Sequence, residues 1–477
     1  MKMKYVLGVP LIAFVTIMST PSIQDCYANA INVTNVSVSS VAGGMADIQF
    51  DISWSNSWNL TWSDDGGLTT VTNWDAAWVF LKFKTPSSGW RHGMLASSGH
   101  SPAAGTSIEI GANGAGTNIG VFIKRDALGA GSLSAQGMKL RWDFAQSSLG
   151  GTSDVDISIH AIEMVYIPKG AFALGSGGVE ANHFYKFPTS TDPYWVANEV
   201  AINCGPSAGK LTDANNTYYN NLLLPNAFPK GYAAFYCMKY EISQGQYAAF
   251  LNHLDSSDAD ARYPAYSGTS RYTISVVSNQ YSSSAPDRAC NFLSVQDLCS
   301  YLDWSGLRPM TELEFEKACR GTINPEINEY VWGTTTAAKF TSLNGIDGSG
   351  SETALPASAN CNYFNAINGP VRVGIFAQPG SSRQKAGAGF YGVMDLAGNV
   401  YECVVMAFSE GVSFIPTHGD GLLYTAPDGW PTFYGFMRRG GSWSNLAADL
   451  QTSCRYLSTD SNRDSHYGGR GVRTSQP

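Results

Sequence analysis

The sequence has few charged residues. Asp, Glu, Lys and Arg make up only 14% of its 477 residues, against about 25% in an average soluble domain. Glycine (50 residues) and a heavy aromatic content of 12 Trp, 24 Tyr and 22 Phe take their place. That aromatic content excludes a disordered chain, and the composition does not fit a long coiled coil. We therefore expect short strands and long polar loops around an aromatic core.

Positive charge and long hydrophobic runs are also scarce. Lys and Arg number 30 against 38 Asp and Glu, a net charge of −8. Nucleic acid is therefore not an expected partner, because its phosphates are bound by a basic surface. After residue 30 no run approaches the roughly 18 apolar residues of a transmembrane helix, so we expect no membrane span in the mature chain.

Residues 1–30 have the pattern of a secretory signal peptide. Lys2 and Lys4 precede an apolar stretch at residues 5–19, and Ala28, Asn29 and Ala30 form an A-x-A cleavage site. The alternative is a retained membrane anchor. The pattern predicts a secreted or extracytoplasmic protein, at the cell surface or in the periplasm.

Cysteine is absent between residues 27 and 203, and no C-x-x-C occurs anywhere. That spacing argues against a zinc ribbon or a thioredoxin-type redox site. If Cys26 leaves with the signal peptide, an even number remains, which favours disulfides outside the cytoplasm without giving their pairing. The eight are Cys204, Cys237, Cys290, Cys299, Cys319, Cys361, Cys403 and Cys454.

Residues 31–162 are predicted to form a β-sandwich domain. Ile48, Phe50, Ile52 and Trp54 alternate with polar residues, the period of a strand with one buried face. Seven of the 12 Trp lie in this part, and most are expected in the core. Trp58 and Trp62 fall in a polar loop of Asn, Ser and Asp, so they are the better candidates for exposure on a sugar-stacking or protein-docking face. No linker separates this part from the second domain, residues 163–477.

Three short helices are predicted in the second domain from their capping boxes. Ser243 with Gln246, Ser294 with Asp297, and Thr311 with Glu314 each place a hydroxyl three residues before an acceptor side chain. The other segments are irregular loops, which in an ordered domain must be held by aromatics, disulfides or metal ions.

Six segments of the second domain resemble the formylglycine-generating enzyme, or sulfatase-modifying factor, family. They are MVYIPKGAF at 164–172, KYEIS at 239–243, LRPMTELEFE at 307–316, YGVMDLAGNVYE at 391–402, RGGSW at 439–443 and GVR at 471–473. The resemblance implies an α+β fold made mostly of strand and loop, a C-type-lectin-like domain that follows the β-sandwich and often holds calcium.

The resemblance also implies a calcium site and a disulfide. The Glu402 side chain, with backbone oxygens of Asp395, Gly398 and Val400, would bind calcium, a hard ion that prefers oxygen ligands. Alternatively, Glu402 forms an ion pair with an arginine such as Arg473. A disulfide between Cys319 and Cys454 is implied as well, and its alternative is a reactive thiol at Cys454.

The family's enzymes oxidise a sulfatase cysteine to formylglycine with copper held by two cysteines. Those cysteines follow the RGGSW segment, but residues 443–452 contain none here, and Asn445 cannot replace a thiolate that binds soft Cu(I). The seven histidines form no H-x-x-x-H or H-E-x-x-H motif, which disfavours an iron or zinc centre. We therefore expect neither copper nor iron.

Two functions follow as hypotheses. The first is a non-catalytic binding or structural module that recognises a glycan, a peptide or its own copies in surface filaments or layers. The second is a family enzyme with altered chemistry. Either would use a groove formed by Trp443, Asn445, Arg455 and Arg473.

Overall fold

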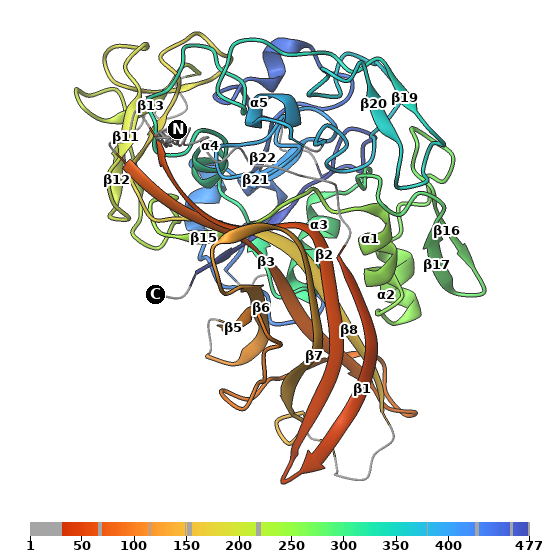
Figure 1. The fold of residues 1–477 in the computed structure, drawn as a ribbon. Helices are drawn as coiled ribbons and strands as arrows, with labels where there is room; N and C mark the ends of the chain where they lie inside the picture. Colours follow the sequence, from red (N-terminus) through yellow and green to blue (C-terminus); the bar gives the residue numbers. More distant parts are fainter. Residues whose placement is uncertain are drawn as a thin grey trace, which may run out of the picture.

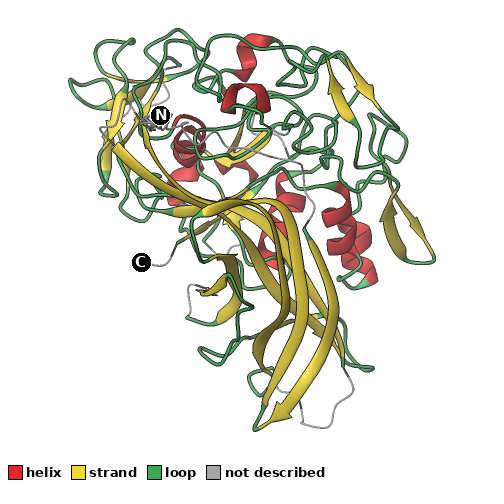
Figure 2. Ribbon diagram, viewed as in Figure 1, coloured by secondary structure: helices red, strands yellow, loops and turns green. Residues whose placement is uncertain are grey.

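Strands and loops make up most of the chain, and helices are few and short (Figure 2). The computed structural model describes residues 31–64, 69–113, 116–147, 149, 155–215, 221–378, 380–424, 429–457 and 461–475. The predicted signal peptide at residues 1–30 lies outside the described residues. None of the described helices is long and apolar enough to cross a membrane.

The N-terminal part consists of two β layers. In one layer β2 lies between β1 and β7, and in the other β3 lies between β8 on one side and β4 and β6 on the other, with β5 beyond β6 (Figure 1). The layers are joined where Asn59–Asp64 of β2 pairs with Thr69–Trp74 of β3. The strands are β1 (Asn32–Ala42), β2 (Met45–Asp64), β3 (Thr69–Lys84), β4 (Arg91–Gly93), β5 (Thr106–Ala112), β6 (Asn118–Arg125), β7 (Gly129–Asp143) and β8 (Asp156–Ile167).

The predicted period-two alternation is confirmed. Ile48, Phe50, Ile52 and Trp54 of β2 are at most 2% exposed and pack in one cluster with apolar residues of β3, β6 and β7. A β-sandwich core therefore forms between the two layers, as alternating strands require.

The prediction that Trp58 lies exposed in a loop is wrong. Strand β2 continues to Asp64, and Trp58 is buried against the second domain, with Nε1 donating to Asn73 Oδ1 at 2.6 Å. Trp62 is half-buried and packs beside Phe390, with ring centroids 6.4 Å apart. Of the polar residues around these tryptophans, Thr61 and Ser63 are exposed, whereas Asn56 and Ser57 are buried. The polar composition therefore did not indicate the long strand.

One sheet continues from the N-terminal layers into the second domain. Strand β8 pairs with β3 along Asp156–Val165 and, along Met164–Ile167, with β15 (Phe235–Met238). Strand β15 pairs with β24 (Gly471–Thr474), which pairs with β18 (Arg308–Pro309). The chain thus passes residue 163 inside a strand, in agreement with the absence of a linker.

The rest of the second domain is built from small sheets and short helices around loops. All three predicted capping boxes are present, at the starts of α1, α3 and α4. The helical elements are α1 (Gln244–Leu251), α2 (Ser256–Arg262), α3 (Val295–Trp304), α4 (Glu312–Arg320), α5 (Arg383–Ala386), η1 (Ser409–Ser413), η2 (Phe433–Gly435) and η3 (Ala447–Leu450). The remaining strands are β9 (Phe172–Leu174), β10 (Phe184–Lys186), β11 (Tyr194–Val196), β12 (Ile202–Cys204), β13 (Leu211–Asp213), β14 (Leu222–Leu224), β16 (Ile274–Val277), β17 (Gln280–Ser283), β19 (Ser342–Asn344), β20 (Thr353–Leu355), β21 (Glu402–Val405), β22 (Phe436–Arg439) and β23 (Arg455–Tyr456).

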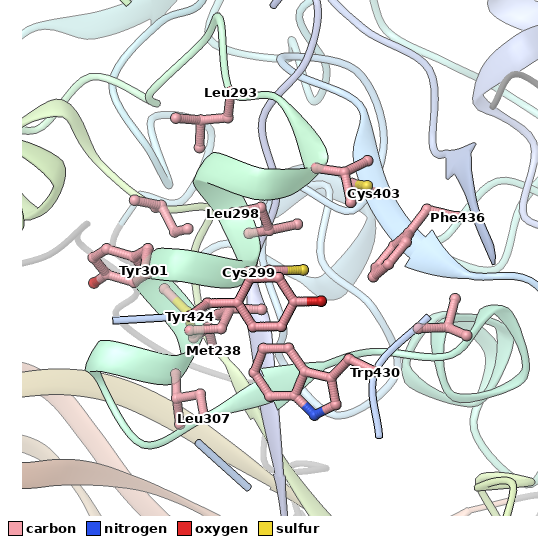
Figure 3. Packing of buried hydrophobic residues seen from close by; sticks show 14 of the residues in the cluster. Met238, Leu293, Leu298, Cys299, Tyr301, Leu307, Cys403, Tyr424, Trp430 and Phe436 are labelled. Atoms are coloured by element: carbon pink, nitrogen blue, oxygen red, sulfur yellow. The ribbon is translucent and has the colours of Figure 1, made fainter. Parts of the chain in front are cut away.

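Helix α3 is at the centre of the largest hydrophobic core. Figure 3 shows Leu298, Cys299 and Tyr301 of this helix in the core, with Cys403 of β21 and Phe436 of β22 on one side of the helix and Tyr301 on the other. The same core includes Trp78 and Phe80 of β3, so it spans both parts of the chain. The loops of the second domain are therefore held by a core that both domains share.

Candidate functional site

A small groove lies where β22 ends and the predicted site loop begins. Its volume is about 70 Å³, and it is lined by Ala181, Asn182, Tyr401, Arg438, Arg439, Gly440, Gly441, Asp449, Cys454, Arg455 and Tyr456. Gly440 has a positive φ of 78°, and a Cβ there would lie 2.4 Å from the Leu396 carbonyl oxygen. Only glycine fits that position, so the RGGSW segment is shaped by backbone packing.

Asn445, two residues after Trp443, organises the loop. Its Oδ1 accepts from the Ser442 hydroxyl at 2.6 Å, and its Nδ2 donates to Tyr401 Oη at 2.7 Å and to Asp449 Oδ2 at 3.3 Å. The amide is thus occupied by its own loop. Trp443 is only 5% exposed and donates from Nε1 to the Ser465 carbonyl, so it supports the loop from beneath.

Arg455 lines the groove but its charge is neutralised within the core. Its guanidinium binds Glu312 Oε2 at 2.7 Å and Asp213 Oδ2 at 2.5 Å, and all three side chains are fully buried. Arg439 also binds Glu312, at 3.2 Å. Because a buried ion pair of this kind fixes one arrangement of its neighbours, Arg455 holds β23 against α4.

Of the four residues predicted to form the groove, Arg455 lines it, whereas Trp443, Asn445 and Arg473 are not among its lining residues. Arg473 is 1% exposed, stacks on Trp78 with 4.3 Å from its guanidinium carbon to the ring centroid, and donates to the carbonyls of Ala112 and Gly306. Strand β24 lies in the shared sheet, so its arginine points to the contact between the two domains.

Three carboxylates gather at the predicted calcium loop. Glu402 Oε1 accepts from Arg470 Nε at 2.5 Å, and Asp395 Oδ2 accepts from the Gly374 amide at 2.6 Å. Glu241 accepts from Asn399 Nδ2 at 2.6 Å and from the Val400 amide at 3.0 Å. The arginine partner of Glu402 is therefore Arg470. The sequence suggested Arg473 as an example of such a partner.

Burial raises the pKa of all three carboxyl groups, that of Asp395 to about 6. Repulsion from Asp395 and Glu402 raises the pKa of Glu241 further. Glu402 Oε2 is buried with no hydrogen-bond partner. An unpartnered buried oxygen with excess negative charge around it fits a hard cation. No three His, Cys, Asp or Glu side chains among the described residues could hold a metal ion, so backbone oxygens would have to complete such a site.

The predicted Cys319–Cys454 disulfide is not formed in the structure. All eight cysteines after residue 200 are buried free thiols. Cys319 lies in the last turn of α4, in a hydrophobic cluster with Phe315 and Leu396, whereas Cys454 precedes β23 at the groove. Desolvation by burial raises the pKa of Cys454 to about 11. The alternative of a reactive Cys454 thiolate is therefore also disfavoured.

Two features at the loop of Trp443 and Asn445 were not predicted from the sequence. The first is an Asp464–His466 pair, in which Asp464 Oδ1 contacts His466 Nδ1 and the imidazole stacks on Trp443 at 4.8 Å. The second is an apolar rim of three side chains, Phe364, Leu446 and Tyr456, which are 51–59% exposed. The D-x-H spacing was a readable signal for the pair, whereas the rim depends on distant loops meeting.

Asn445 links the members of the apolar rim. Its carbonyl accepts from the Phe364 amide at 2.9 Å, and it directly precedes Leu446. Its side chain binds Tyr401, which stacks on Tyr456 with ring centroids 5.5 Å apart. The rim residues thus come from three segments that these contacts connect through Asn445 and Tyr401.

The second domain is similar to known proteins. Residues 157–475 match the model of the sulfatase-modifying factor enzyme 1-like domain. PvdO from Pseudomonas aeruginosa is 18% identical, with 66% of this chain and 95% of PvdO covered and a TM-score of 0.33. Treponema denticola variable protein 1 is 15% identical, with 66% and 96% covered and the same TM-score. No curated protein matches the chain. By the extent of the domain match, the chain belongs to the sulfatase-modifying factor enzyme 1-like family.

Proposed function

We propose that this protein is a non-catalytic binding module, secreted or held at the cell surface, whose second domain recognises its partner through the apolar rim. The partner is a glycan, a peptide or a second copy of the chain. The observation that carries the proposal is a difference between the polar and the apolar side chains around Asn445. The polar groups bind one another, while Phe364, Leu446 and Tyr456 are turned to solvent.

Exposed aromatic and aliphatic side chains on a rigid loop favour contact recognition. A preorganised surface loses little conformational entropy on binding, and aromatic anchors supply most of the binding energy in many interfaces. The groove beneath the rim, about 70 Å³ in volume, is far smaller than an ordinary small-molecule site. It therefore suits a protruding group of a larger partner better than an enclosed substrate.

The residues of the loop do not fit copper. Two thiolates would be needed for Cu(I), and residues 443–452 supply an amide at Asn445 with no cysteine. Cys454 is the cysteine that lines the groove, and its buried thiol has a raised pKa. We assign no copper-dependent step to this chain.

Calcium has a structural role in this proposal. Glu402, together with backbone oxygens of Asp395, Gly398 and Val400, would hold the ion, and the ion would offset the negative charge that Glu241 adds. Bound calcium would fix the loop at residues 395–402, which packs against Gly440 through the Gly398 amide. The ion would thereby stiffen the base of the groove.

The proposal is tested by binding to arrays of glycans and of peptides, with self-association measured by sedimentation velocity. We expect binding on at least one of these three readouts, and a loss of about tenfold or more in the variants Leu446→Asp and Tyr456→Ala. Leu223→Asp is the matched control, because Leu223 on β14 is also half-exposed (52%) but is not part of the rim. Equal loss in the control, or conversion of a sulfatase-derived cysteine peptide by the copper-loaded protein, would contradict the proposal.

One observation favours an enzyme with altered chemistry as a second candidate. The Asp464 carboxylate binds His466 Nδ1, and this contact lowers the pKa of Asp464. An imidazole oriented by a carboxylate is the common form of a general base. Hydrolysis of chromogenic ester or glycoside substrates that is lost in His466→Gln and retained in Leu446→Asp would support this candidate over the binding module.

A further inference from the structure

Two histidines that are far apart in sequence meet where the two domains touch. His160 lies on β8, and His253 follows the C-terminal end of α1. Their Nε2 atoms are 3.3 Å apart, their ring centroids 4.5 Å apart, and the ring planes nearly perpendicular at 83°. This site is separate from the groove and from the predicted calcium loop.

The hydrogen bond of His253 Nδ1 places the lone pair of this ring on Nε2. His253 Nδ1 lies 2.7 Å from the Ala249 carbonyl oxygen. A carbonyl oxygen only accepts, so Nδ1 of the neutral ring carries the hydrogen, and Nε2 presents to His160 Nε2 a lone pair that a metal ion could take in place of this hydrogen bond. A second-shell carbonyl of this kind is what orients metal-binding histidines. The Ser158 hydroxyl lies 3.0 Å from His160 Nε2, on the same face of β8.

The histidine pair has a cavity on one side and aromatic rings packed against it on the others. His160 lines a cavity of about 340 Å³ between β8, α1 and α3. Trp90 packs against His253 at 4.4 Å, and Trp304 against His160 at 4.9 Å, both as ring-centroid distances. Water or a small ligand in the cavity can therefore reach the pair, while indole rings cover its remaining sides.

Two lysines lie near the pair. Burial lowers the pKa of Lys82 well below its usual value, against the smaller opposing effect of Asp303 and Asp420, and its Nζ donates to the carbonyls of Trp304 and Gly421. Lys84 pairs with Asp156 at 3.4 Å. Burial lowers the pKa of His253 to about 4 and that of His160 well below its usual value, and the charge of Lys82 acts in the same direction on both. The imidazole nitrogens would therefore have to hold a cation against this positive field.

We propose that His160 and His253 bind one divalent transition-metal ion of borderline softness, such as Zn²⁺, and that this ion ties β8 to α1. Two nitrogens that bind a tetrahedral ion at about 2.0–2.1 Å each lie about 3.3–3.4 Å apart, the separation seen here. No group of three His, Cys, Asp or Glu side chains fit for a metal forms among the described residues. Ser158 and water from the cavity complete the coordination.

The test uses the untagged full chain, dialysed against a chelator and titrated with Zn²⁺ by calorimetry. We expect about one equivalent of bound Zn²⁺ and a rise in Tm. The variants His160→Gln and His253→Gln should each weaken binding by about tenfold or more. His100→Gln is the matched control, because both of its nitrogens are occupied by the Ala96 carbonyl and the Arg141 amide.

A second measurement keeps the test valid if a variant fails to fold. In the wild-type protein, Zn²⁺ should protect His160 and His253 from diethyl pyrocarbonate, and Co²⁺ should give the visible absorption bands of a tetrahedral nitrogen site. If less than one equivalent of Zn²⁺ binds and the two histidines are not protected from the reagent, the contact between them is a hydrogen bond only. That result overturns the proposal. Equal loss of affinity in His100→Gln also overturns it, because binding would then lie elsewhere.

Discussion

Burial decides the chemistry of the individual cysteines. Desolvation raises the pKa of Cys204 and of Cys237 to about 12 and that of Cys454 to about 11. None of these three is a thiolate at neutral pH, and the thiolate is the form that attacks disulfides and binds soft metals. The even number of cysteines suggested a disulfide framework. A count carries no information on where each side chain points, so it could not show whether two thiols meet.

Thiol titration tests this arrangement. In the native protein we expect no rapid reaction of the eight buried thiols with Ellman's reagent, because burial denies both access and ionisation. In denaturant without reductant, eight thiols should react, or nine if Cys26 is retained. A count lower by two would restore a disulfide, and peptide mapping of Cys319 and Cys454 would identify it.

Lys317 gives a second prediction about a single buried residue. Burial lowers its pKa from 10.5 to about 7, and its Nζ donates to the Gly170 carbonyl at 2.5 Å. Between pH 7 and 10.5 the unfolded chain binds more protons than the folded one, so this residue makes stability rise with pH. The variant Lys317→Met should lose that rise. Urea unfolding at pH 7 and pH 9.5 measures it, and a difference from wild type that is equal at both values would contradict the assignment.

The helix starts show what local sequence can predict. Each capping box lies within four residues, so it forms wherever the helix forms and needs no distant partner. The alternating residues of β2 were readable for the same reason. In contrast, the burial of Trp58, the approach of Glu241 to Glu402, and the meeting of His160 with His253 depend on residues more than 90 positions apart or on another domain. The sequence predicted some of the segments that carry these residues, but not which of the residues meet.

Removal of the α4 cap should destabilise the domain. Thr311 Oγ1 accepts from the Glu314 amide at 3.2 Å and donates to the Pro229 carbonyl at 3.1 Å. Thr311 and Glu314 are both buried, so Thr311→Ala should cost about 1–2 kcal/mol in the free energy of unfolding. The control is Asp255→Ala at the start of α2, where the side chain makes no cap hydrogen bond. A cost there as large as at Thr311 would contradict the role of the cap.

The loop at residues 395–402 gives a calcium prediction with a defined pH dependence. Since the pKa of Asp395 is about 6 in the folded protein and 3.8 ordinarily, its ionisation makes the metal-free protein lose stability as pH rises from about 4 to 6. Calcium favours the ionised form and should reverse this loss. We expect a larger calcium-induced rise in Tm at pH 7.5 than at pH 5, reduced in Glu402→Gln. A rise that is independent of pH would place the ion elsewhere.

For the whole molecule, the shared sheet makes the two domains one structural unit. Lys239, at the end of β15, supplies the clearest link between them. Its Nζ lies 3.0 Å from Glu163 Oε2 and 3.5 Å from Asp75 Oδ2, and it stands over the Trp58 ring at 4.6 Å. All three charged side chains are almost completely buried. A cation of the second domain is therefore held by carboxylates of the strands that enter it.

Loss of this cation should weaken the whole molecule. Lys239→Met leaves Glu163 and Asp75 buried without their counter-charge, which should cost about 3–5 kcal/mol. The double variant Lys239→Met with Glu163→Gln should recover part of that loss, because it removes one of the two uncompensated charges. Lys84→Met is the control, since its partner Asp156 is 72% exposed and surface pairs contribute about 1 kcal/mol or less. Urea unfolding followed by tryptophan fluorescence measures all four proteins. If the double variant were less stable than Lys239→Met, the buried charge would not be the cause, and the packing of the Lys239 stem on Trp58 would account for the loss.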